Sequence, residues 1–573
     1  MMRNVRLRSA SAWRWRTLSI ACIAAVALLG AAAPPASAQG FFERVVGFFT
    51  GSGDTELGVE AETPNVEAQG PAAITAGTGD TLLIVDTLNR RIVRVRRDGT
   101  LVDTVELQDV VRPVDVAVFE QVIYVLDALG RKVSAFREDG DLLQTFGLPD
   151  SIALNGTVTL TIGGPDDIRI STGAREARLD AAQARGGTPA VEMADARSVA
   201  TPEGVVTATA ARGGDDRMAL RLEGGAGLAA RGGAQALEIT STGFLAGARL
   251  LGVDDLGRVF VLVDELPADG TLAPRTVVKR FSPAGELTGQ AVVPLEQAAY
   301  VPNRPVTVTE DGRVFALIPA AEEVSLVELD LDTRSALPPL GAGEDVDGLE
   351  VPPGFEDAVA RAYADDMLAP RGTTSRADII ARAEAYLETA WLLDPKNYPA
   401  SGTASRCDPD GGAMWRRPPK LDGQMGATFV GLPYKWGGYD SLDGFQRKLD
   451  RGDLAGDVCT CRSSRHDYCL VWNAAGVDCS GFVSRALGAS YHTTSRLHEI
   501  TTKLERWTDL QPGDIVNRRG RHVRLVTGIS TEGTVLVHVI ESAVSCHGMC
   551  RASYEVSQLR GYEPRRYDFL ADP

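Results

Sequence analysis

Residues 81–105 read TLLIVDTLNRRIVRVRRDGTLVDTV, and residues 122–146 read VIYVLDALGRKVSAFREDGDLLQTF. The two stretches repeat one another, since Asp86 aligns with Asp127 and the Asp-Gly pairs align at the same offset of 41 residues. Each copy reads as a strand, a polar turn, a strand, an Asp-Gly turn and a strand, because Asp-Gly between apolar runs is a strong hairpin signal. A period of about 40 residues made of short strands is typical of propeller blades.

Weaker copies follow in DDLGRVFVLVDE near residue 254 and TEDGRVFALIP near residue 309, while residues 150–250 blur into Gly/Ala/Arg-rich sequence. We therefore predict an all-β propeller over residues 70–351, with about five to seven blades. The first unit, GPAAITAGTGDTLLIVDTLNRRIVRV, resembles NHL-type propeller repeats. The resemblance implies a binding platform for a protein or glycan partner, and the alternative is a spacer without a ligand.

The N-terminus has the three parts of a secretory signal peptide. Five arginines within the first 16 residues precede the apolar run LSIACIAAVALLGAAA, and Ala36-Ser37-Ala38 is a small-x-small cleavage signature. We expect residues 1–38 to be removed before Gln39, and the protein to be secreted or periplasmic. The alternatives are an uncleaved membrane anchor or lipidation at Cys22. No later stretch approaches the ~18 apolar residues of a membrane span.

Between the signal peptide and the propeller, residues 39–69 read as a tether. The stretch begins with FFERVVGFF and continues as an acidic, glycine-rich segment. We expect FFERVVGFF to pack on the next domain, and contact with a membrane surface is the alternative.

Length and charge limit the function classes. The chain has 573 residues, so two or more domains are expected. Its net charge of −17 argues against a nucleic-acid partner, because phosphates would be repelled.

The apolar pattern becomes helical after residue 351. FEDAVARAYADDML and SRADIIARAEAYLETAWLL place apolar residues at helical spacing. We assign residues 352–374 to a helical linker and residues 375–573 to a second domain.

A candidate nucleophile lies in GVDCSGFVSRALG, residues 476–488. Cys479 should begin a helix, where unpaired N–H groups and the helix dipole favour the thiolate and lower the cysteine pKa. The alternative is a structural cysteine.

Candidate partners for the thiol follow along the chain. LQPGDIV ends at residue 516, the predicted strand HVRLVTGI begins at His522, and the next strand, TVLVHVIESA, holds His538 and Glu541. A nucleophilic cysteine needs a base and a third group that orients the base. His538 and Glu541 differ by three positions, so they face opposite sides of a strand and only one can orient His522.

The ordered set FVGLPYKWGG, GVDCSGFVSRALG, LQPGDIV and RHVRLVTGI resembles the NlpC-type family of papain-like cell-wall cysteine peptidases over about residues 375–560. The resemblance implies a circularly permuted papain-like α+β fold. It implies Cys479 as nucleophile, His522 as base and Tyr434 near the oxyanion. Aligning VIESA with the family's strand places Glu541 as third residue, with His538 as the alternative.

The resemblance also implies peptidoglycan stem peptides as substrate, for instance a γ-D-glutamyl–diamino-acid bond, and no cofactor. The same resemblance implies structural roles for Asp478 and Asp514. An amidase or acyltransferase acting on another amide or ester is one alternative. An inactive, propeller-based binding or scaffold protein is another.

Seven cysteines remain after the signal peptide, all in the last third of the chain. Export favours disulfides, and an odd count leaves one thiol over, which we expect to be Cys479. The other six are Cys407, Cys459, Cys461, Cys469, Cys546 and Cys550. Cys459, Cys461, His466 and Cys469 also have a spacing that could suit zinc, which is the alternative to disulfides there.

Overall fold

The computed structural model describes residues 42–173, 175–180, 191–201, 203–225, 236–269, 271–331, 337, 340, 349, 351–364, 366, 373–398, 415–460 and 468–571. The predicted signal peptide, Cys22 included, lies outside this part of the chain, as do Cys407, Cys461 and His466. Gly40–Pro573 forms one compact unit. Within the described ranges, no helix has the length and apolar character that crossing a membrane requires.

Five four-stranded antiparallel sheets in the described residues are meanders, in which each strand pairs with the next along the chain. The first two contain β3 (Ala73–Ala76), β4 (Thr81–Asp86), β5 (Arg91–Arg96), β6 (Leu101–Glu106), β7 (Pro113–Phe119), β8 (Val122–Asp127), β9 (Lys132–Arg137) and β10 (Leu142–Gly147). The other three contain β11 (Val158–Gly164), β12 (Asp167–Thr172), β13 (Arg175–Asp180), β14 (Val191–Ala194), β15 (Arg197–Thr201), β16 (Gly204–Arg212), β17 (Arg217–Gly224), β18 (Ala236–Thr240), β19 (Phe244–Val253), β20 (Val259–Leu266), β21 (Arg275–Phe281) and β22 (Leu287–Val292).

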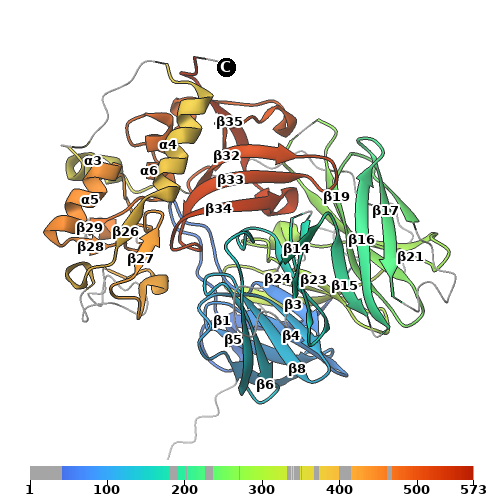
Figure 1. Cartoon of the computed structure of the whole chain (residues 1–573). Helices are drawn as coiled ribbons and strands as arrows, with labels where there is room; N and C mark the ends of the chain where they lie inside the picture. The colour runs from blue at the N-terminus through green and yellow to red at the C-terminus, as the bar shows by residue number, and fades with distance from the viewer. Residues whose placement is uncertain are drawn as a thin grey trace, which may run out of the picture. The chain divides into compact units, whose positions relative to one another are not determined.

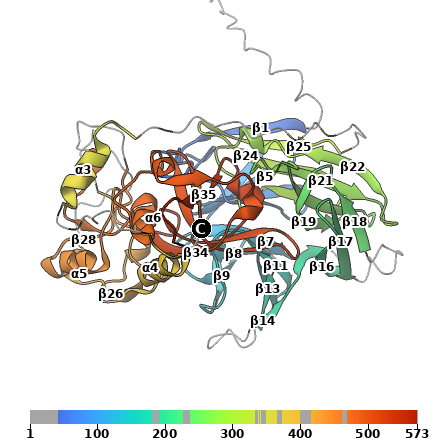
Figure 2. The same ribbon diagram turned by 90° about the horizontal axis from the view of Figure 1, so that it is seen from above.

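A sixth sheet joins the two ends of this region. β1 (Phe42–Thr50) pairs antiparallel with β25 (Glu323–Leu329), as Figure 2 shows. The sheet continues through β24 (Val314–Pro319) and β23 (Val306–Val308), and β2 (Glu56–Leu57) pairs parallel with β1 at its edge.

The six sheets form a closed β-propeller. The first strand of each sheet contacts the first strand of the next, and β23 contacts β3 to close the ring. Backbone hydrogen bonds between Ile74 and Arg304 and between Arg304 and Ala72 reinforce this junction. The described residues therefore contain six blades, within the predicted range.

The expected tether is wrong for its first part, because Phe42–Thr50 is a propeller strand. Phe48 packs in an apolar cluster between the sixth and first blades. Pairing the first strand with the last satisfies backbone groups that would otherwise form two open edges. The described part of this motif, residues 42–49, thus packs on the propeller, as expected, but as part of a blade.

The repeat read from the sequence is confirmed strand by strand in β4–β6 and β8–β10. The buried Asp127 carboxylate, at the end of β8, accepts N–H groups of Val111, Arg112 and Gly130. The blurred stretch at residues 150–250 also forms two blades. There β17 buries alternate residues, so the strand pattern is regular within a stretch that is rich in Gly, Ala and Arg.

The second region is built on a six-stranded antiparallel sheet. Its order is β30 (Thr501–Lys503), β35 (Glu563–Tyr567), β31 (Ile515–Arg518), β32 (His522–Ser530), β33 (Leu536–Ala543) and β34 (Gly548–Glu555). Two helices, α4 (Arg376–Glu388) and α6 (Cys479–Leu487), pack on one another (Figure 1). α4 also packs on strands β33 and β34, and α6 packs on strands β32 and β33.

Smaller elements complete this region. They are α3 (Phe355–Ala362), α5 (Leu442–Arg451), β26 (Ala390–Leu392), β27 (Thr428–Val430), β28 (Leu454–Ala455), β29 (Ala474–Ala475) and short 3₁₀ turns at Pro395–Asn397, Pro419–Leu421, Leu497–Glu499, Trp507–Asp509 and Val556–Leu559; a further 3₁₀ turn, Leu295–Gln297, belongs to the propeller.

Two helical predictions need adjustment. α3 lies in the predicted linker, but the ring centroids of Phe355 and Trp436 are 5.2 Å apart. α3 therefore belongs to the core of the second region. α4 ends at Glu388, and the AWL that follows is strand β26, because its backbone pairs antiparallel with β27.

Candidate active site

Cys479 is the first residue of α6, as its sequence predicts. Asp478 caps the helix, and its carboxylate accepts the Gly481 N–H at 2.6 Å. The Cys479 side chain is 0% exposed, and it is the free cysteine of the described residues.

The Cys479 thiol is not activated in this arrangement. Burial, followed by the negative charge of Asp478, raises the pKa of Cys479 well above its usual value. The backbone N–H groups of Val523 and Ser480 act in the opposite direction but are outweighed. The expectation that the helix start lowers the pKa of Cys479 is therefore wrong for the structure as it stands, because the thiol is cut off from water.

His522 is the first residue of β32, and Glu541 lies on the neighbouring strand β33. Nε2 of His522 lies 2.7 Å from a carboxylate oxygen of Glu541, with both side chains buried. A carboxylate only accepts hydrogen bonds, so Nε2 carries the hydrogen in this contact. Nδ1 is then the nitrogen that can take up a proton.

Glu541 has two further partners. The Tyr554 hydroxyl donates to its other oxygen, and Nε of Arg524 lies 3.0 Å from the oxygen that contacts His522. Burial alone would raise the pKa of Glu541, but the Arg524 charge and the hydrogen bond from His522 bring it down to about 2. Glu541 is therefore an ionised acceptor for His522 throughout the neutral range.

His538 does not contact His522. Its Nε2 lies 2.7 Å from the Ser530 hydroxyl, and its Nδ1 lies 2.8 Å from the Ser553 hydroxyl. Of the two alternatives for the third residue, the structure brings Glu541 to His522. His538 lies on the same strand as Glu541 but is paired with serines on the two neighbouring strands.

Tyr434 lies beside Cys479 in the fold. Its backbone bridges Val477, two residues before the cysteine, and its N–H donates to the His547 carbonyl. The side chain is buried, and among the described residues its hydroxyl has no hydrogen-bond partner. Burial, followed by the nearby charge of Cys479, raises the pKa of Tyr434 well above its usual value, so the hydroxyl is a donor.

The remaining predicted residues have structural roles here. Asp514 binds the guanidinium groups of Arg376 and Arg566 at 2.7 and 2.9 Å. Cys546 and Cys550 form a disulfide on the turn into β34. Cys459 and Cys469 are also disulfide-bonded, so their sulfurs are not zinc thiolates, and the zinc alternative is not met at these two positions.

One feature near Cys479 was missed by sequence reasoning. Residues 60–69, within the predicted tether, form a short antiparallel hairpin whose tip is Pro64-Asn65. The backbone carbonyl of Asn65 lies 3.4 Å from the Cys479 sulfur. The local signal was no more than a Pro-Asn turn between acidic residues, which does not indicate where the turn docks.

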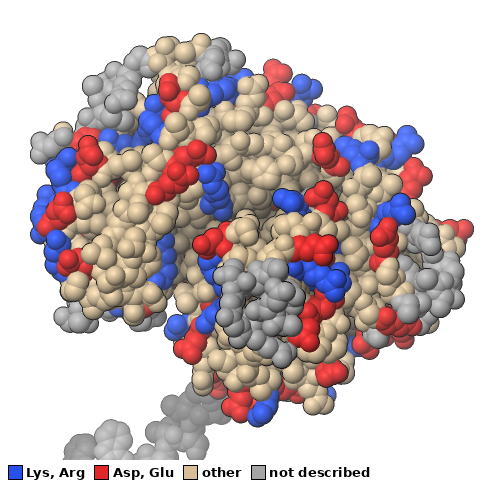
Figure 3. All heavy atoms as spheres, in the orientation of Figure 1, with Lys and Arg blue, Asp and Glu red and all other residues tan. Residues whose placement is uncertain are grey.

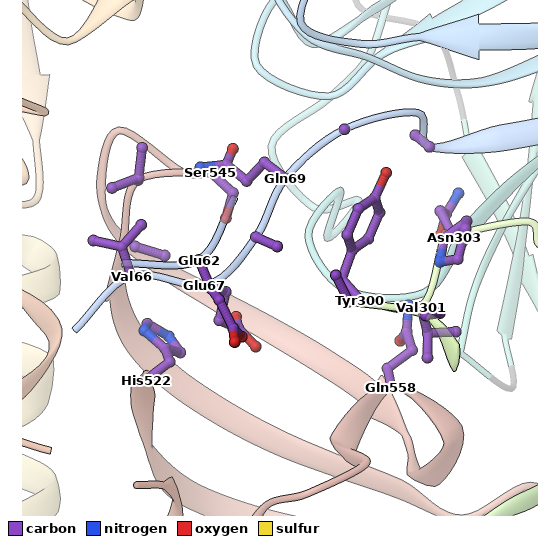
Figure 4. Close-up of a pocket in the computed structure, with 18 of the residues that line it drawn as sticks. Glu62, Val66, Glu67, Gln69, Tyr300, Val301, Asn303, His522, Ser545 and Gln558 are labelled. Carbon is purple, nitrogen blue, oxygen red and sulfur yellow. The ribbon is translucent and has the colours of Figure 1, made fainter. Parts of the chain in front are cut away.

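A cavity of about 560 Å³ opens beside this hairpin, lined by both the propeller and the second region. Figure 4 shows Glu62, Val66 and Glu67 next to His522, with Tyr300 and Asn303 of the propeller on the other side. On the face drawn in Figure 3, acidic and basic side chains are interspersed.

No protein-family model and no curated protein match the chain. Solved structures do match parts of it. Hydrazine synthase of Kuenenia stuttgartiensis is 16% identical with a TM-score of 0.29, covering 45% of this chain and 78% of its own. Virginiamycin B lyase from Staphylococcus aureus is 10% identical with a TM-score of 0.28, covering 48% and 100%.

A protein of the DUF4221 family from Bacteroides vulgatus is 10% identical with a TM-score of 0.31, covering 50% of this chain and 97% of its own. Likenesses this distant carry no information on function. The propeller assignment rests on the closed ring of sheets described above.

Proposed function

We propose that residues 375–573, which make up the second region apart from α3, form an NlpC-type, papain-like cysteine hydrolase that cleaves amide bonds in peptidoglycan stem peptides. The observation that carries the proposal is the buried 2.7 Å contact between His522 and Glu541, on strands against which the Cys479 helix packs. A nucleophile at a helix start, a base and an orienting carboxylate are the parts that thiol hydrolysis needs. The substrate class comes from the sequence motifs alone.

In this proposal His522 takes the thiol proton through Nδ1, and the Cys479 thiolate attacks the carbonyl carbon of the substrate amide. The C–N bond breaks, the leaving amine takes the proton from His522, and an acyl-enzyme remains. Water then releases the acyl group and returns the thiol. Tyr434 donates to the oxyanion, together with N–H groups at the start of α6.

The test is mass spectrometry of fragments released from purified peptidoglycan by the mature protein and by its Cys479→Ala variant. We expect fragments from the wild type alone, with masses that identify the bond. Fragments from both proteins would contradict the assignment of Cys479. If neither releases fragments while Cys479 still reacts with thiol reagents, an amidase or acyltransferase on another substrate becomes the better proposal.

The propeller is proposed to hold or position the substrate or a partner, and the protein is proposed to be exported. Propeller residues Tyr300 and Asn303 line the cavity that reaches His522, which supports a joint binding surface. If Cys479 remains inert to thiol reagents under every condition, an inactive scaffold would replace the hydrolase proposal.

A further inference from the structure

The hairpin of residues 60–69 occupies the place where a substrate would have to bind. Cross-strand backbone hydrogen bonds join Glu60 to Gln69 and Thr63 to Val66 in both directions. Pro64 and Asn65 form the two-residue tip, and both are buried. Asn65 has φ 60°, in the left-handed region that asparagine tolerates better than most residues.

The backbone of Asn65 is bound at the nucleophile. Its N–H donates to the Gly520 carbonyl at 3.0 Å, and its own carbonyl accepts from the Cys479 thiol at 3.4 Å. The thiol is 0% exposed under this cover. No substrate carbonyl can approach the sulfur while Asn65 stays in place.

The side chain of Asn65 fills a polar subsite. Its carbonyl oxygen accepts the Thr494 N–H at 3.1 Å and also the Thr494 hydroxyl, and its amide nitrogen donates to the Ser480 hydroxyl at 3.2 Å. Both ends of the carboxamide are therefore satisfied, the nitrogen by Ser480 next to the nucleophile and the oxygen by Thr494. This arrangement recognises a primary carboxamide by its donor and its acceptor.

Ion pairs hold the arms of the hairpin. Glu60 binds Arg416 at 2.8 Å, Glu62 binds Arg521 at 2.5 Å, and Glu67 binds Arg524 at 2.5 Å. The Tyr562 hydroxyl also donates to Glu67. All of these partners lie in the second region, whereas the base of the hairpin is tied to the propeller by the Gly58 N–H, which donates to Asp86 at 3.0 Å.

We propose that residues 60–69 are an intramolecular inhibitor, which closes the Cys479 centre by placing the Asn65 carboxamide in a subsite made by Ser480 and Thr494. The inference rests on the proposed function, because an inhibitor requires that Cys479 be a nucleophile, but its test does not require a substrate. The turn is an inhibitor rather than a substrate. Thr63 and Val66 are hydrogen-bonded across it, and the Asn65 carbonyl oxygen accepts a hydrogen bond from the thiol. The hairpin must therefore open before catalysis, so hydrolysis by the wild type proceeds only through its open fraction.

The experiment measures the rate of Cys479 alkylation by iodoacetamide in the mature protein, with Cys479→Ala as the background. A Glu60→Gln, Glu62→Gln, Glu67→Gln variant weakens the arms without changing size, and Asn65→Gly removes the carboxamide while tolerating the same φ. The control carries Glu43→Gln, Glu106→Gln and Glu286→Gln, all on exposed propeller side chains.

We expect both hairpin variants to be alkylated at least about tenfold faster than the wild type, and the control at the wild-type rate. Adding a cyclised peptide of the sequence EAETPNVEAQ should slow alkylation of the triple variant again, and its Asn→Ala version should not. Intact mass should show no cleavage between Asn65 and Val66.

The proposal is overturned if the triple variant, folded by its melting curve, is alkylated at the wild-type rate, or if the purified protein is found cut after Asn65. The triple variant answers the question even if Asn65→Gly fails to fold. Fast alkylation of an opened variant that releases nothing from peptidoglycan would leave the inhibitor in place and reject the proposed substrate.

Discussion

Nε2 of His522 lies 2.7 Å from the Glu541 carboxylate, on the strand next to its own, and Arg524 lies against the same carboxylate. The guanidinium carbon of Arg524 in turn lies 4.2 Å from the ring centroid of Tyr554 and 4.6 Å from that of Tyr562. The orientation of the proposed base therefore depends on a buried charge network rather than on one contact.

Glu541→Gln should lower hydrolysis by at least about 100-fold, because a neutral amide neither stabilises the imidazolium nor enforces the same ring nitrogen as donor. It should also lower the free energy of unfolding by about 1–3 kcal/mol, since Arg524 loses a buried anion. Rates of fragment release and urea unfolding measure the two effects. His538→Gln is the matched variant, and activity that depended on His538 instead would contradict the assignment.

Tyr434→Phe should reduce hydrolysis by about 10-fold or more, because it removes a proposed donor to the oxyanion. The free energy of unfolding should stay the same or rise slightly, since the buried hydroxyl has no partner among the described residues. A large loss of stability without a change in rate would show that the hydroxyl is structural.

The first propeller strand supplies a stability test in two adjacent residues. Phe48 is 4% exposed between two blades, whereas Phe49 is 73% exposed. Phe48→Ala should lower the free energy of unfolding by about 3–5 kcal/mol. Phe49→Ala should change it by no more than about 0.5 kcal/mol. Equal effects in urea unfolding would contradict the placement of β1 in the sixth blade.

The buried thiol predicts a pH dependence of stability. The pKa of Cys479 is raised in the folded protein. The contribution of the neutral thiol to the free energy of unfolding is therefore fully present below the pKa of a free thiol and is lost as the pH rises above that value. The free energy of unfolding of the wild type, relative to Cys479→Ala, should fall above about pH 8.5 by up to ~1.4 kcal/mol per pH unit. A flat difference from pH 7 to 10, in urea unfolding of both proteins, would show that the thiol is not enclosed.

Much of the fold follows from local pattern. The Asp-Gly turns and alternating strands after Thr81 predicted two blades at their observed positions. The blades between residues 150 and 250 were not resolved from sequence, because small and charged residues dilute the alternation that β17 nevertheless shows. The helix start at Cys479 was predicted, but the state of its thiol was not, since burial by a distant segment sets that pKa.

By itself, the sequence determined the two blades that follow Thr81 and the opposite facing of His538 and Glu541, because each depends on residues close together in the chain. Only the tertiary structure decided that β1 closes the propeller and that Asn65 covers Cys479. Both contacts join segments hundreds of residues apart. Their formation depends on the packing of Phe48 between blades and on ion pairs along the hairpin arms, which leave no periodic pattern in either segment.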